Sequence, residues 1–132
     1  MADNDKFDYS VEDLPSVDAS ILRLRGPIDA FSYLSLKALL ARWIEGSLDV
    51  PKRRHLAIDF NAVTYAASSG WSVIFLQSSL MREAGRQLVL FSLGERAAHS
   101  LRLLEQRQQL VQTAGDQAAA VKLLATAAPA VS

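Results

Sequence analysis

The stretch LAIDFNAVTYAASSGWSVIFL, at residues 56–76, is the part of the sequence that decides the fold. Residues 56–60 are almost continuously apolar, which predicts a strand that is covered on both faces of a sheet. We expect residues 62–67 to form a connection, and residues 68–85 to form a helix that opens with Ser-Ser-Gly and ends with glycine. The apolar positions at helical spacing in that helix are Val73, Ile74, Leu76, Leu80, Met81 and Ala84.

The residues before this stretch predict a hairpin and a first helix. Residues 7–11 alternate between apolar and polar, as in a half-buried strand, and residues 21–24 predict a second strand that pairs with the first. Asp29 then stands where a helix N-cap is needed, because its carboxylate can accept unpaired backbone N–H groups. Leu36, Leu40 and Trp43 follow at helical spacing, with Trp43 in the core, and the helix is expected to end near Gly46.

Strands and helices continue to alternate after Gly85. We expect a strand at 88–91, a helix at 95–106 with Leu101 and Leu104 facing inward, a strand at 110–113 and an alanine-rich helix at 117–125. The order ββαβαβαβα predicts an α/β fold with a mixed, mostly parallel sheet, an N-terminal antiparallel hairpin and helices packed on the sheet. We interpret residues 1–132 as one domain with a core at about 17–125 and a flexible tail at 126–132.

The composition excludes several classes of protein. A chain of 132 residues without cysteine predicts one domain, and it has no thiols for disulfides, zinc ribbons or thiol catalysis. Fourteen basic residues balance 14 acidic ones, which argues against non-specific binding of nucleic acid. The first 20 residues are acidic, unlike a secretory signal, and no apolar run reaches the roughly 20 residues of a membrane span. We therefore predict a cytoplasmic protein with no membrane insertion.

Catalysis and metal binding are not expected. His55 and His99 lie 44 positions apart, without a cluster of ligands at suitable spacing, so we predict no metal site and no cofactor. The triplet at 52–54, Lys-Arg-Arg, is interpreted as a solvated loop. Ser68 between a strand and a helix is similar to the nucleophile elbow of serine hydrolases, but only one histidine follows it and no glycine-rich oxyanion loop is present. We therefore predict that the chain is not an enzyme.

The order and spacing of two motifs resemble the STAS domain family, in particular its anti-sigma factor antagonists. Asp59 matches an acidic residue at a strand end, residues 63–66 match the loop that follows, and residues 68–70 match the Ser-Ser-Gly that opens a helix. Residues 26–29, Gly-Pro-Ile-Asp, match the segment before the first helix. The resemblance covers roughly residues 17–125, and it implies the same α/β fold.

The resemblance also implies a function, that of a partner switch. In the family an anti-sigma kinase phosphorylates the first serine of Ser-Ser-Gly, here Ser68, and a phosphatase removes the phosphate. The unphosphorylated protein binds the anti-sigma factor, so Asp29, Ser69, Gly70 and Trp71 are expected to join Ser68 in the partner-binding surface. A phosphate at a helix N-terminus meets unpaired N–H groups and adds about −1.5 to −2 charge.

One departure from the family leaves alternatives open. The acidic residue that precedes the phosphorylated serine is replaced by Ala67. The alternative function is therefore a non-phosphorylated STAS adaptor, for example a subunit of a membrane transporter complex. Ser68 or Ser69 could also serve only as a helix N-cap, and Trp71 could be either an exposed anchor for a partner or a core residue.

Overall fold

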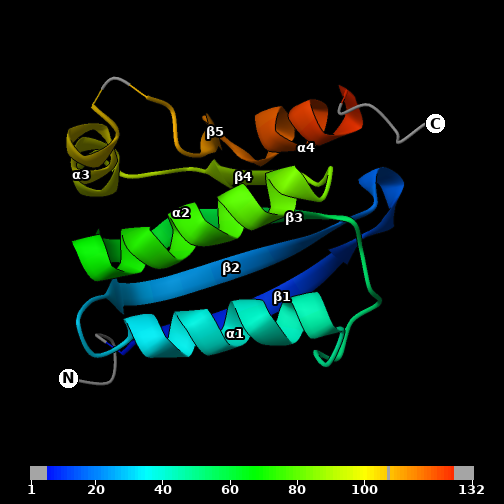
Figure 1. The fold of residues 1–132 in the computed structure, drawn as a ribbon, viewed down its shortest axis with the longest axis horizontal. Helices are drawn as coiled ribbons and strands as arrows, with labels where there is room; N and C mark the ends of the chain where they lie inside the picture. The colour runs from blue at the N-terminus through cyan, green and yellow to red at the C-terminus, as the bar shows by residue number, and fades with distance from the viewer. Residues whose placement is uncertain (1–5, 107, 127–132) are drawn as a thin grey trace.

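The computed structural model describes residues 6–106 and 108–126, which form one five-stranded sheet with helices on both faces (Figure 1). The strands, in the order in which they are hydrogen-bonded, are β1 (Asp8–Leu14), β2 (Ala19–Ile28), β3 (His55–Ala66), β4 (Leu88–Phe91) and β5 (Gln112–Ala114). The helices are α1 (Tyr33–Glu45), α2 (Ser68–Glu83), α3 (Glu95–Glu105) and α4 (Gln117–Thr126), and a 3-10 turn, η2 (Pro15–Val17), joins β1 to β2.

The pairing of the strands confirms the predicted fold class. β1 runs antiparallel to β2, and all other neighbouring strands are parallel. Most of the predicted tail, residues 127–132, lies outside the described residues. None of the described helices is both long enough and apolar enough to cross a bilayer.

Two apolar layers enclose the sheet. Leu56, Ile58 and Phe60 project from β3 into the larger layer, which packs under α1, α2 and α3. Ala57 projects to the opposite face, where a smaller layer packs under α4. The alternation along β3 explains why its sequence is apolar at nearly every position.

β3 is longer than the sequence predicted. The segment 62–66, expected to be a connection, continues the strand because the last residues of β2 pair with it, from Arg25 opposite Ala62 to Ile28 opposite Ala66. The ladder shifts register twice along this section, and most of the added residues are exposed. An exposed, irregular strand end lacks the apolar run that identified its first half. As a result, β2 and β3 end side by side.

Two smaller expectations about the C-terminal half were wrong. Leu101 is buried as predicted, but Leu104 is 41% exposed, because α3 turns only the stripe containing Ala97 and Leu101 toward the core. β5 begins at Gln112 and not at residue 110, because the Glu105 carboxylate accepts the N–H groups of the two preceding residues, at 2.8 and 3.2 Å. These N–H groups are therefore not free to pair with a strand.

The basic triplet at 52–54 also differs from the expectation of a solvated loop. Arg53 donates two hydrogen bonds to the Asp13 carboxylate, at 2.7 and 2.9 Å, and Arg54 donates to the carbonyl of Gly85 at 2.7 Å. These side chains connect the loop before β3 to β1 and to the end of α2. Their role in the structure is to hold elements together.

Gly70 allows α2 to start directly against the end of β2. Its α-carbon lies so close to Ile28 that an added β-carbon would be 2.4 Å from Ile28 Cγ2, well inside contact distance. The backbone N–H of Ala67 donates to the carbonyl of Ile28 at 2.8 Å, which fixes the same junction. The start of α2 and the loop that follows β2 are thereby held next to each other.

We predict that Gly70→Ala destabilises the fold, although alanine normally favours a helix interior over glycine. The added methyl group must displace Ile28, and overpacking of this kind costs about 1–3 kcal/mol in the free energy of unfolding. Urea denaturation measures the change. Gly115→Ala is the matched control, because an added β-carbon there meets nothing within 4 Å. Equal stability of the two variants would contradict this account of the junction.

Candidate functional site

Ser68 is exposed and lies at the first residue of α2. The N-cap position is occupied by Ala67, and no side chain caps this end of the helix within the described structure. The expectation that Ser68 or Ser69 serves as the N-cap is therefore wrong, since both lie inside the first turn. The first helical hydrogen bond runs from Trp71 N to the carbonyl of Ala67, so the three N–H groups before it have no helical partner.

This geometry suits an anion next to Ser68. A helix N-terminus combines unpaired N–H donors with the positive end of the helix dipole. Ala67 has no side-chain acceptor that could compete for those donors. A phosphate on the exposed hydroxyl would therefore meet backbone groups that the protein itself leaves uncapped.

Asp29 lies in the loop that follows β2, beside the start of α2. Its Oδ1 accepts hydrogen bonds from the backbone N–H groups of Phe31 and Ser32, both at 2.9 Å. The Asp29 N–H in turn donates to Ser32 Oγ at 2.8 Å, so the two residues form a reciprocal capping box. Asp29 thus caps the turn that leads into α1 and not the helix itself, which corrects the prediction: the N-cap of α1 is Ser32, and no side chain makes a capping hydrogen bond there. The hydrogen bonds from Ser32 and Phe31 lower the pKa of the Asp29 carboxyl.

Trp71 is fully buried, which corrects its assignment to the partner-binding surface. Its ring stacks between Phe60 and Phe75, with centroid distances of 5.4 and 6.0 Å. The indole N–H donates to Ser100 Oγ at 2.7 Å, so the buried polar group is satisfied and α2 is tied to α3. Gly70 is buried too, which leaves Asp29, Ser68 and Ser69 as the accessible members of the expected surface.

Exposed apolar side chains near this site were not recognised from the sequence. Phe31, two residues after Asp29, is 89% exposed, and Leu34 on the first turn of α1 is 57% exposed. A groove of about 460 Å³ runs between α1 and α2 from Ser69 toward Leu80. Leu76 and Leu80 of α2, counted among the apolar helix positions, are more than half exposed. The signal was available in Phe31, an aromatic residue inside a capping segment.

Asp59 has a structural role and is not part of the site. It lies within β3, not at its end, and its carboxylate accepts a hydrogen bond from Arg23 at 2.7 Å. Arg23 also donates to Glu12 at 2.7 Å and to Gln117 of α4 at 2.9 Å. These contacts place Asp59 toward the α4 side of the sheet, away from Ser68. Among the described residues, no three histidine, aspartate or glutamate side chains are placed to share a metal ion.

Comparison with known proteins assigns the family. The STAS domain family matches residues 9–114, most of the described chain. The chain belongs to the STAS domain family. No curated protein sequence matches this STAS domain.

Solved structures share the fold of this STAS domain at low sequence identity. An anti-sigma factor antagonist from Mycobacterium paratuberculosis has a TM-score of 0.70 and 20% identity, over 91% of this chain and 95% of that one. The Bacillus cell fate determinant SpoIIAA in its phosphorylated form has a TM-score of 0.60 and 11% identity, over 88% and 99%. The murine anion transporter Slc26a9 has a TM-score of 0.69 and 13% identity, over 92% of this chain and 23% of that one.

The lowered pKa of Asp29 predicts a pH-dependent contribution to stability. The ionised carboxylate stabilises the fold above its ordinary pKa of 3.8, and this contribution is lost as the pH falls through the lower pKa of the folded state. Asp29→Asn keeps a capping oxygen but does not titrate. The stability difference between wild type and Asp29→Asn, from urea denaturation, should therefore shrink as the pH is lowered past 3.8. A difference that stays constant with pH would refute this role of the charge.

Burial of Trp71 predicts a large loss of stability when the ring is removed. Trp71→Ala should lower the free energy of unfolding by about 3–5 kcal/mol, because it leaves a cavity between two aromatic rings. Trp71→Phe keeps an aromatic ring in the stack and loses the hydrogen bond to Ser100, so its loss should be clearly smaller. Urea denaturation compares the two variants. A change below about 0.5 kcal/mol for Trp71→Ala, typical of surface positions, would place the ring outside the core.

Proposed function

We propose that this STAS domain is a partner-switching regulator, an anti-sigma factor antagonist whose binding to its partner is controlled by phosphorylation of Ser68. The observation that carries the proposal is the exposed Ser68 hydroxyl at an uncapped helix N-terminus. The partner is an anti-sigma factor with serine kinase activity, and a phosphatase resets the switch. The domain itself acts by binding and has no catalytic role.

The contacts around Ser68 explain how a phosphate would act without unfolding the domain. The core under the site is formed by Gly70 and Trp71, and neither depends on the Ser68 hydroxyl. A phosphate would add about −1.5 to −2 charge beside Asp29, on a surface that the partner must approach. Like charges brought together in an interface oppose binding. Phosphorylation and partner binding would therefore exclude each other.

The exposed apolar residues beside the site give the partner something to bind. The backbone of Phe31 is held by its N–H hydrogen bond to Asp29, and its ring is almost fully in solvent. Aromatic side chains that become buried in a partner's pocket are common anchors of protein interfaces. Phe31 takes the anchor role that the sequence had suggested for Trp71. The proposed partner-binding face consists of Asp29, Phe31, Ser68 and Ser69.

Structural relatives support the proposal. Solved structures named as SpoIIAA exist in an unphosphorylated and a phosphorylated form, and both share the fold of this chain with a TM-score of 0.60. Phosphorylation is therefore compatible with the fold.

We predict that the cognate kinase and ATP place a single phosphate on Ser68. Intact-mass and peptide mass spectrometry should find the phosphate in wild type and in Ser72→Ala, and lose it in Ser68→Ala. Ser72 is the matched control, because it is an exposed serine one turn further along α2. Ser68→Asp should weaken binding of the unphosphorylated partner about tenfold or more, measured by calorimetry.

Two results would overturn this mechanism. One is phosphate on a residue other than Ser68. The other is equal affinity of the partner for wild type and Ser68→Asp, with Ser68→Ala binding like both.

A second candidate function is favoured by Ala67. The missing acidic side chain suits a STAS domain that binds a partner permanently through the same face, as an adaptor subunit of a membrane transporter complex. The similarity to a chain of the Slc26a9 transporter shows that the fold also occurs within such a protein. Affinity purification distinguishes the two candidates: recovery of a transporter subunit, in a complex unchanged by Ser68→Glu, would select the adaptor.

A further inference from the structure

A separate hollow lies at the end of α2 that is remote from Ser68. It has a volume of about 180 Å³ and is enclosed by the last turns of α2, the start of β4 and the segment that leads into β5. Arg82, which lines it, lies 14 residues after Ser68, or about 21 Å along the helix at 1.5 Å per residue. The hollow is therefore distinct from the proposed partner-binding face.

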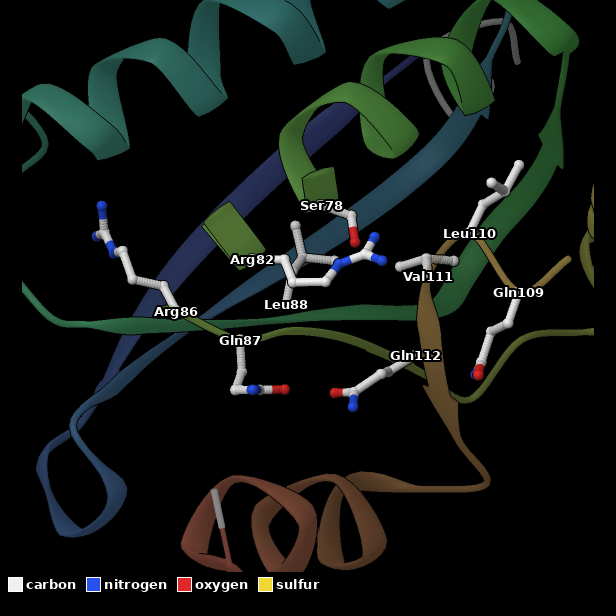
Figure 2. A pocket seen from close by; sticks show the side chains of 9 residues that line it. All are labelled: Ser78, Arg82, Arg86, Gln87, Leu88, Gln109, Leu110, Val111 and Gln112. Carbon is white, nitrogen blue, oxygen red and sulfur yellow. The ribbon is translucent and has the colours of Figure 1, made fainter. Parts of the chain in front are cut away.

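Ser78 contributes its hydroxyl to the lining of this hollow. The Ser78 residue as a whole is only 7% exposed, and the buried side-chain atom without a partner in the described structure is Gln77 Nε2 on the preceding residue. Figure 2 shows this hydroxyl pointing from α2 into the hollow. A hydroxyl that faces a hollow can both donate to and accept from a ligand atom placed there.

The positively charged side chain of Arg82 projects into the same hollow. Its guanidinium extends from α2 toward Val111 and lies in the same region as the Ser78 hydroxyl (Figure 2). Arg82 is an exposed residue, and within residues 6–106 and 108–126 no carboxylate lies within 4.0 Å of it. Arg82 is therefore a charged donor that the described structure leaves available.

The neighbouring Arg86 is different, because its guanidinium is already engaged. It donates to the carbonyls of Arg54 and Arg53, at 2.8 and 3.1 Å, and lies over the Trp43 ring at 5.0 Å. Burial and the nearby Arg54 charge lower the pKa of Arg86. Arg82, and not Arg86, is therefore the guanidinium at this hollow that is open to a ligand.

The remaining walls are polar amides over a small apolar floor. Gln87 and Gln112 extend toward one another from the starts of β4 and β5, and Leu88 and Val111 lie between them and α2 (Figure 2). Glu105 fixes the outer wall, since its carboxylate is occupied by the N–H groups that precede β5. The backbone at Leu110 and Val111 is therefore fixed before a ligand arrives.

We propose that this hollow binds a small oxyanion, the carboxylate or phosphate group of a small metabolite, through the Arg82 guanidinium and the Ser78 hydroxyl. A guanidinium presents paired donors that match two oxygens of either group. The volume of about 180 Å³ is below the roughly 300–1,000 Å³ of sites for drug-sized ligands, so the hollow suits a single small anionic group. The proposal does not depend on Ser68 or on the function proposed for it.

The test is a titration of the full chain with small anions at constant ionic strength, in which backbone amide NMR monitors binding. The probes are inorganic phosphate and malonate, with sodium chloride as the reference. We expect saturable shifts of the amides of Ser78, Leu110 and Val111, with a Kd on the order of 1 mM, the weak end of specific binding. Saturation by one probe only assigns the ligand to the phosphate or the carboxylate class, and saturation by both assigns it to oxyanions in general.

Variants distinguish the proposed site from general attraction to a basic surface. Arg82→Gln should raise the Kd about tenfold or more, and Ser78→Ala should raise it less, because charged donors contribute more than neutral ones. Arg102→Gln, at an exposed arginine of α3, is the control and should bind like wild type. The amide spectra also report that each variant is folded. Absence of saturation by both probes at about 10 mM, ten times the expected Kd, or unchanged binding by Arg82→Gln, would overturn the proposal.

Discussion

The contact between Gly70 and Ile28 is the constraint on which the functional end of this STAS domain depends. It sets how closely α2 approaches β2, and it does so through the absence of a side chain. The hydrogen bond from Ala67 to Ile28 fixes the same junction from the backbone. Because the Asp29 loop follows Ile28 directly and Ser68 follows Ala67 directly, this single contact brings two segments that are 39 residues apart into one surface.

A second set of contacts, on the core side of α2, fixes the direction of this helix. Trp71 enters the core one residue after Gly70, stacks between two phenylalanines and reaches Ser100 on α3 with its N–H. Trp43 does the same for α1, where its indole N–H donates to the buried Ser20 at 2.9 Å. Each large ring therefore combines apolar burial with one polar contact that defines its orientation. The two helices that border the groove are each anchored in this way.

Much of the fold could be predicted from the sequence, because it follows from local features. The apolar run at 56–60 predicted a buried strand, and Asp29 was expected to accept backbone N–H groups, which it does in the turn before α1. Both features depend on a few adjacent residues. The extension of β3 could not be predicted, because those residues are strand only through pairing with β2. Leu104 and Trp71 were misjudged for a related reason. Helical spacing shows which residues lie on the same face of a helix, but it does not show how much of that face is buried by the neighbouring elements. For the site, the sequence located Ser68 and Asp29 but gave no indication of which aromatic residue reaches solvent.

The separation of buried and exposed residues around the junction has a consequence for how such domains diverge. Gly70 and Trp71 are required for folding, while the side chains of Phe31 and Ser68, which meet solvent beside them, are packed against little else. Substitutions at the exposed positions can therefore alter recognition without a compensating change in the core. A genome with several duplicated copies of this scaffold could keep their signalling pathways separate by varying only a handful of surface side chains.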